Sequence, residues 1–391
     1  MKIKQNMLSF IKNKKQRLVE LLPLRKPARN KKDLYFLTLL AFISIGAFLF
    51  SVYNKTIISF DLYTTMLSAS NLMAKAIEAI RDYRNENRIS FSPDDINLTG
   101  LIGLRYSPIT TTLGDLGAKR TSTNPNFAAL LVYLFNQAGV HEGDAVAIGA
   151  SGSFPALIIA TLAAAQAMKL FPILICSLGA SQWGANDPAF TWIEIEYALI
   201  TKKVFPEHYR AVALSIGGDR DIGLEMPVEG RQLLIKKISS HPGKFIYIDD
   251  LQENKNTRID IYQRYAGTRK ITVFVSIGGG WADLGEDPAV LQLKPGLNKI
   301  ANLPASEKRG VLFEMAAKGI PVIHLLNIRE LAFYYGLPWD PSPLPEPGSG
   351  YIFTKFTTKP IIPVQILAAI YFIIFIAIIV CWRYKIKIIN M

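Results

Sequence analysis

The sequence predicts an α/β fold with a largely parallel, doubly wound sheet, in a domain held by two transmembrane helices. Three observations support this prediction. Short β-branched apolar runs alternate with longer helical runs between residues 126 and 335. Glycine-rich turns follow several of these short runs, and two long apolar stretches lie near the ends of the 391-residue chain. Because helices connecting parallel strands cover both faces of a sheet, the alternation predicts a doubly wound architecture.

The two apolar stretches define the predicted domain organisation. Residues 34–54 and residues 360–382 hold no charged side chain. Each stretch is long enough to cross a bilayer as a helix, which needs about 20 residues. We interpret the first as an uncleaved signal anchor, because a long basic segment precedes it and no clear cleavage site follows. Residues 55–359 are then expected to form the main domain.

Charge gives this organisation an orientation. Residues 1–33 hold eleven Lys and Arg against two acids, and residues 383–391 add three more basic residues, out of a net charge of +13. Because basic residues mark the cytoplasmic side, both terminal tails are expected inside and residues 55–359 outside the cytoplasm. The main domain is then almost neutral, which argues against a nucleic-acid partner. The two cysteines are too few for a Cys/His zinc site.

The order of elements follows from apolar spacing. Residues 55–90 are expected to contain a leading helix over Leu62–Tyr83. Ser92–Asn124 is long, polar and irregular, so it either lines a site or is a solvated connector. Residues 338–359 are expected to form a proline-rich spacer and an edge strand at Tyr351–Phe356. Strands are predicted at Ala145–Ile148, Ile173–Ser177, Ala211–Ile216, Phe245–Ile248, Ile271–Ile277 and Pro321–Leu326, and helices at Phe127–Gln137, Ala156–Met168, Trp192–Ile200, Arg231–Ile238, Ile259–Tyr265, Ser306–Ala317 and Arg329–Tyr335.

A strand, turn and helix around Gly149–Pro155 indicate serine chemistry. The turn places Ser151 and Ser153 at the carboxyl end of a strand, where open α/β sheets bind ligands. Gly149 to Ser153 approaches the Gly-x-Ser-x-Gly elbow of serine hydrolases, although Ser153 replaces the second glycine. A hydrolase of that kind orders its triad as serine, acid, histidine. The candidates in that order are Ser151, then Asp219, Asp221 or Asp283, then His324.

The same turn also suits anion binding without covalent chemistry. Backbone amides at a helix start can hold a carboxylate. Ser215–Gly218 followed by Asp221–Gly223 resembles Ser276–Gly279 followed by Asp283–Gly285, and each pair of segments offers two glycines after a strand and a matching carboxylate. The predicted ligand-binding residues are Gly149, Gly152, Ser153, Gly217, Gly218, Gly278 and Gly279, with Lys119 and Arg120, and Arg105 and Arg220 as further cations. No nucleotide or metal motif is present, so no cofactor and no metal are expected.

Several segments together resemble a known bacterial family, the poly-gamma-glutamate system protein. They are Tyr106–Thr111, Leu113–Gly114 with Ala118–Thr121, Ile148–Ala156, Ser215–Gly218, Gly319–Asn327 and Gly336–Pro341. The resemblance covers nearly the whole chain. It implies a place in the bacterial inner membrane, beside the machinery that polymerises glutamate and moves the polymer outward. The implied partners are membrane subunits of the poly-gamma-glutamate synthase, the acidic polymer and membrane lipid.

Two hypotheses of function follow. In the first, the chain is an accessory protein of poly-gamma-glutamate synthesis or export, whose external domain contacts the polymer or a synthase subunit. In the second, it is an external serine amide hydrolase or acyltransferase that trims, releases or attaches the polymer, with Ser151, Asp283 and His324 as its catalytic residues. The resemblance brings no established reaction with it, so it does not decide between them.

Overall fold

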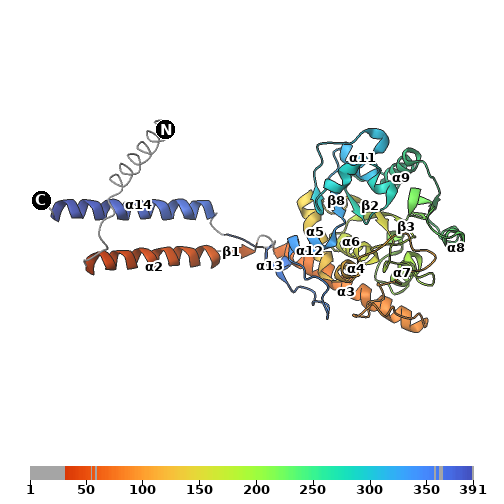
Figure 1. Cartoon of the computed structure of the whole chain (residues 1–391), viewed down its shortest axis with the longest axis horizontal. Coiled ribbons are helices and arrows are strands. Elements are labelled where there is room, and N and C mark those ends of the chain that lie inside the picture. Colours follow the sequence, from red (N-terminus) through yellow and green to blue (C-terminus); the bar gives the residue numbers. More distant parts are fainter. Residues whose placement is uncertain (1–30, 54, 58–59, 356–357, 361–363, 390–391) are drawn as a thin grey trace, which may run out of the picture. The chain divides into compact units, whose positions relative to one another are not determined.

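The computed structural model describes residues 31–53, 55–57, 60–355, 358–360 and 364–389 of the chain. The chain divides into two compact units, one of residues 57–358 and the other of residues 1–56 with 359–391. Figure 1 gives the labels of the helices and strands. The expected terminal tails lie mostly outside the described residues, since residues 1–30 and 390–391 are not described.

The larger unit is built on a seven-stranded sheet with the order β5-β4-β3-β2-β6-β8-β7. Neighbouring strands are parallel except for the pair β7 and β8. The predicted fold class, an α/β fold with a mostly parallel sheet, is confirmed at this level. The strands are β2 (Ala145–Ser151), β3 (Phe171–Ser177), β4 (Ala213–Ser215), β5 (Lys244–Ile246), β6 (Ile271–Ile277), β7 (Gly296–Asn298) and β8 (Val322–Leu325).

Helices cover both faces of this sheet. Val146, Ile148 and Ala150 of β2 belong to the larger apolar core, with residues of α3, α5 and α6. Ala145 and Ala147, which point to the other face, belong to the second core with residues of α9 and α11. The helices of the larger unit are α3 (Phe60–Glu86), α4 (Leu116–Ser122), α5 (Asn126–Ala138), α6 (Pro155–Ala167), α7 (Trp192–Thr201), α8 (Val228–Ser239), α9 (Leu251–Ala266), α10 (Trp281–Leu284), α11 (Val311–Ala317), α12 (Ile328–Tyr335) and α13 (Tyr351–Lys355).

Three local predictions were wrong or incomplete. The expected edge strand at Tyr351–Phe356 is the helix α13, whose adjacent residues Ile352 and Phe353 are both buried. A strand would send two adjacent side chains to opposite faces, whereas one helical turn places both against the core. The short antiparallel strand β7 was missed, because three residues carry no apolar alternation. The stretch Ser92–Asn124 contains the helix α4, which begins where the Asp115 side chain accepts a hydrogen bond from the Ala118 amide.

The smaller unit contains the helices α2 (Lys31–Tyr53) and α14 (Val364–Ile389). The Ser44 hydroxyl on α2 lies 2.7 Å from the Tyr371 hydroxyl on α14. The short strands β1 (Lys55–Ile57) and β9 (Thr358–Pro360) pair with each other. Within the described residues, no helix combines the length and the apolar character that crossing a membrane requires. The two predicted spans therefore have no support from the structure.

Candidate functional site

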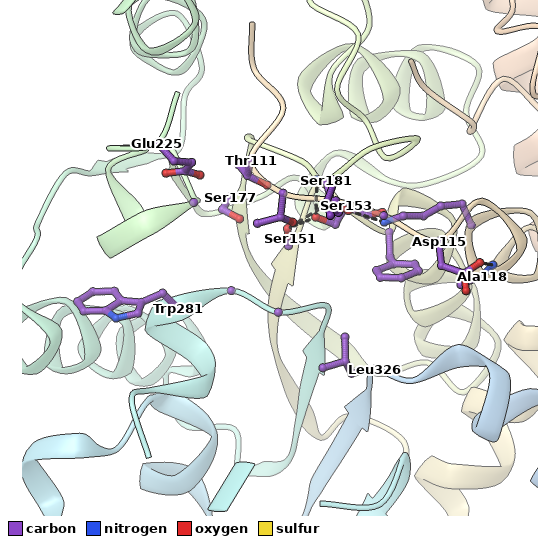
Figure 2. Close-up of a pocket in the computed structure, with 18 of the residues that line it drawn as sticks. Thr111, Asp115, Ala118, Ser151, Ser153, Ser177, Ser181, Glu225, Trp281 and Leu326 are labelled. Carbon is purple, nitrogen blue, oxygen red and sulfur yellow. Dashed lines mark hydrogen bonds between the residues drawn. The ribbon is translucent and has the colours of Figure 1, made fainter. Parts of the chain in front are cut away.

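A pocket of about 670 Å³ lies at the carboxyl edge of the sheet. The strand order reverses between β2 and β6, since β3, β4 and β5 follow on one side of β2 while β6 and β8 lie on the other. Ligands of open α/β sheets bind at such a switch point. Figure 2 shows side chains from several elements around this space, among them Ser151, Ser177 and Leu326.

The stretch between residues 111 and 119 forms one wall of the pocket. Its lining residues are Thr111, Thr112, Leu113, Gly114, Asp115, Ala118 and Lys119. Of the two interpretations of Ser92–Asn124, the one in which it lines a site therefore fits its place in the fold. The polar composition of the stretch is explained by its position over the sheet edge.

The two serines of the central turn hydrogen-bond to each other. The Ser151 hydroxyl donates to the Ser153 hydroxyl at 2.9 Å, and the Ser153 amide donates to the Ser151 hydroxyl at 3.2 Å. Ser151 is the last residue of β2 and does not have the positive φ of a strained turn. The structure thus places both hydroxyls at the predicted strand end, without the strained elbow geometry.

Lys119 is buried beside these serines. Its ammonium group donates to the Ser153 carbonyl oxygen and, at 2.8 Å, to the Ser181 hydroxyl. The Ser181 amide in turn donates to the Ser153 hydroxyl at 3.0 Å. The Lys119 nitrogen also lies 3.7 Å from the centre of the Phe154 ring. Ser151 and Lys119 therefore share Ser153 as a partner, Ser151 through its hydroxyl and Lys119 through its carbonyl oxygen. Ser181 contacts both Ser153 and Lys119.

Burial changes the acid–base behaviour of Lys119. Desolvation lowers the pKa of Lys119 from its usual value to about 7, against the opposing effect of the Asp115 charge. None of its hydrogen-bond partners is a carboxylate. A lysine with this pKa is about half uncharged at neutral pH, so it can accept a proton there.

His324 is placed differently from a catalytic base. It lies in β8 beside Ser276 of β6, and its side chain is almost fully buried. Its Nδ1 atom has no hydrogen-bond partner among the described residues, and desolvation lowers the pKa of His324 to about 4. No hydrogen bond in the described part of the chain joins His324 to Ser151. The structure does not bring the predicted triad together through hydrogen bonds.

The candidate acids Asp221 and Asp283 meet at the buried Arg258 of α9. The Arg258 guanidinium contacts Asp221 at 2.6 Å and Asp283 at 3.8 Å. Asp221 also accepts hydrogen bonds from Ser215 and Asn254. The two similar loops after β4 and β6 are thus tied to one arginine, and their matching acids hold the loops in place. Burial, with a smaller contribution from Asp221 and against the effect of Arg258, raises the pKa of Asp283 to about 6.

The predicted glycines have separate roles. A Cβ atom on Gly149 would lie 2.5 Å from the Asp283 carboxylate, so this glycine makes room for that acid. Gly217, Gly218 and Gly278 have positive φ angles of 83°, 72° and 81°, which explains glycine in these turns. The Gly152 amide donates to the Ser177 carbonyl oxygen at 2.8 Å.

Two neighbouring amides on the opposite wall are unused. The amides of Gly279 and Gly280 line the pocket and have no hydrogen-bond partner among the described residues. They follow Gly278, where an added Cβ atom would lie 3.3 Å from the Ser151 Cβ atom. Unused amides beside a hydroxyl are available to a carbonyl oxygen that acquires negative charge.

The predicted cations contribute less than expected. Arg120 makes two hydrogen bonds to the Asp340 carboxylate, at 2.8 and 2.7 Å, and does not line the pocket. Arg105 and Arg220 do not line it either. The ionisable lining residues are Lys119 and the three acids Asp115, Asp219 and Glu225. The pocket is therefore not a cationic site for a polyanion.

The lining residues that sequence reasoning did not single out include Ser177, Ser181, Glu225 and Trp281. Ser177 ends β3 in register with Ser151 of β2, so its position could have been found from the parallel strand ends. Ser181 lies in a loop and Trp281 is the first residue of the short helix α10, and neither position carries a local sequence signal. Across the described residues, no group of His, Cys, Asp or Glu side chains is arranged to hold a metal ion.

Comparisons with known protein families, curated proteins and solved structures gave no match. The function is therefore argued from the pocket and from the sequence resemblance alone.

Proposed function

We propose that this chain belongs to a poly-gamma-glutamate synthesis or export system and that its pocket carries out serine-dependent acyl transfer. The single observation that carries the chemical part is the buried Lys119 beside Ser151 and Ser153, where Lys119 bonds the Ser153 carbonyl oxygen and Ser151 bonds the Ser153 hydroxyl. A serine hydroxyl is a weak nucleophile until a base takes its proton, and lysine serves as that base in known variants of the serine triad.

The proposed reaction starts with uncharged Lys119. The Ser151 hydroxyl oxygen attacks the carbonyl carbon of an amide, and the uncharged Lys119 nitrogen, which lies beside the serines, takes up the proton that the hydroxyl loses. The developing oxyanion is stabilised by the free amides of Gly279 and Gly280. The C–N bond then breaks, and the protonated Lys119 returns its proton to the leaving nitrogen. Water or an acceptor amine attacks the resulting ester, releases the acyl group and restores Ser151.

The link to the polymer rests on the resemblance. Its segments lie far apart in the sequence, yet five of them contribute residues to the same pocket: Thr111, Leu113, Ser151, Gly218 and Leu326. Segments that share one pocket are expected to share one function. The proposed membrane location rests on the apolar sequence of residues 34–54 and 360–382 and not on the structure.

A fluorophosphonate probe, which phosphonylates activated serines with loss of fluoride, tests the chemistry on the full-length chain. We expect labelling that mass spectrometry maps to Ser151, and its loss in the Ser151→Ala and Lys119→Met variants. His324→Gln is the matched comparison, and labelling should persist in it. Loss of labelling with His324→Gln but not with Lys119→Met would instead favour the histidine triad. An adduct on Ser181 would make Ser181 the nucleophile.

The second candidate function is an accessory role through a protein partner. Two large apolar side chains, Leu113 and Phe333, are 84% and 87% exposed. Exposed apolar side chains of this size are typical of contact surfaces. If a synthase subunit covers them, Leu113→Ser and Phe333→Ser should reduce its co-purification with this chain. Probe labelling of Ser151 should stay unchanged in Phe333→Ser, because Phe333 does not line the pocket.

A further inference from the structure

The pocket has two ends that differ in the groups they offer. Figure 2 shows Glu225 and Trp281 on one side of Ser151, and Asp115 and Ala118 on the other. Glu225 and Trp281 lie on opposite walls of the first end, which also includes Asp219. We call this end, formed by Ser177, Asp219, Glu225 and Trp281, the acidic end of the pocket.

The acidic end has fixed geometry. The Glu225 carboxylate accepts a hydrogen bond from the Asp219 amide at 2.8 Å and lies against Gly218, where no side chain could fit. The Trp281 indole nitrogen donates to Glu286 at 3.1 Å. The carboxylate and the ring are therefore both held in place across the pocket.

Ser177 provides an independent indication that this end receives a ligand. Its side chain is only 4% exposed, and its hydroxyl has no hydrogen-bond partner among the described residues. Ser177 lines the pocket, and Figure 2 shows its hydroxyl in the space between Glu225 and Ser151. A hydroxyl that opens into the pocket without a protein partner is available to a polar group bound there.

The charge of this end selects the ligand class. Asp219 and Glu225 are acids, and the one lining cation, Lys119, is about half charged at neutral pH. An aromatic ring facing a carboxylate is an arrangement that binds ammonium groups. A negatively charged group would be repelled by the same carboxylates.

We propose that the acidic end of the pocket binds a primary ammonium group, which in the substrate of the proposed function is the free amino end of a γ-linked glutamate chain. In such a chain every internal nitrogen is part of an amide, and every α-carboxylate stays charged. The ammonium group exists only at the amino end. The carbon that bears this ammonium group also bears an α-carboxylate, which has to lie away from Asp219 and Glu225. The acidic end of the pocket thus distinguishes the amino end from the body of the polymer, which offers carboxylates without an ammonium group. The identity of this ligand rests on the proposed function.

Binding is measured by calorimetry at pH 7 with the full-length Ser151→Ala chain, so that turnover does not interfere. The probes are tri-γ-glutamate with a free amino end and the same peptide with an acetylated amino end, in both D and L forms. We expect the free peptide to bind at least about tenfold more tightly in one of the two forms. Glu225→Gln should remove most of that difference.

The matched control is Glu229→Gln, an exposed acid at the start of α8 that does not line the pocket. This variant should bind like the parent chain. Equal or tighter binding of the acetylated peptide would overturn the proposal, and so would absence of binding by either peptide. Labelling of Ser151 by the phosphonate probe needs no ammonium group, so it tests the proposed function separately.

Discussion

Two buried cations of this chain, Lys119 before Ser151 in the sequence and Arg258 after it, have opposite electrostatic surroundings. Arg258 contacts two carboxylates, Asp221 and Asp283. Burial acts to lower the pKa of Arg258, but the two acids raise it above its usual value. Lys119 has only a carbonyl oxygen, a hydroxyl and an aromatic ring as partners, and burial lowers its pKa to about 7.

The difference separates a charge that holds the fold from a group that can exchange a proton. A buried cation with carboxylate partners keeps its charge at any ordinary pH, whereas a buried cation without them loses it near neutrality. Groups of the second kind concentrate at functional sites. The comparison therefore assigns Arg258 to stability and Lys119 to chemistry, and each assignment can be tested.

Removal of Arg258 is expected to have the largest effect on stability. In Arg258→Met, the buried Asp221 carboxylate keeps its charge but loses its cation, at a cost of about 3–5 kcal/mol. Denaturant unfolding of the variant measures this loss. Adding Asp221→Asn should recover part of it, because the uncompensated charge is then removed.

The control for this variant is Arg264→Met, on the exposed side of the same helix. Its free energy of unfolding should stay within about 0.5 kcal/mol of the parent value. If Arg258→Met lowers the free energy of unfolding by less than about 1 kcal/mol, the comparison fails, because the two cations would then not differ in their contribution to stability.

Removal of Lys119 is expected to affect chemistry instead. Lys119→Met should reduce the rate of Ser151 acylation at least a hundredfold, which is the lower range for loss of a general base. Its stability should change little, because methionine avoids the cost of burying an ammonium group. The acylation rate of Ser151 and the free energy of unfolding are measured on the same preparation. A strong loss of stability with an unchanged acylation rate would reverse the assignments.

The sequence was sufficient to predict the main strands of the sheet and the strand end at which the candidate site lies. The runs at Ile173–Ser177 and Ile271–Ile277 are nearly continuous and apolar, as buried parallel strands require, and they end at the pocket. The glycine turn at the end of β2 identified Ser151 and Ser153. These features are local, because strand periodicity and turn chemistry involve residues close together in the sequence.

The partners of these residues could not be predicted, because they depend on packing. Lys119 reaches Ser181 across 62 positions of the sequence, and Arg258 joins loops that follow two different strands. The triad prediction relied on chain order and chose His324, which is buried in β8. Chain order does not say which side chains share a pocket, and the absence of a carboxylate among the hydrogen-bond partners of Lys119 in the described residues became visible only in three dimensions.

The last expected effect, and the sharpest test for Lys119, is on pH dependence. The pKa of Lys119 is lowered to about 7 in the folded chain, from the usual 10.5. Between these two values the unfolded chain binds more protons, so this residue makes the free energy of unfolding rise with pH. The slope is at most about 1.4 kcal/mol per pH unit. Over the same range the acylation rate should increase through about pH 7 and then level off.

The comparison with Lys119→Met isolates this contribution. In that variant the free energy of unfolding should rise less steeply between pH 7 and pH 10, because its buried residue 119 has no proton to lose. Arg258→Met should keep the Lys119 contribution, since Arg258 stays charged throughout. If Lys119→Met leaves the slope unchanged, Lys119 keeps its usual pKa and cannot serve as the base, and the serine chemistry would then need another proton acceptor.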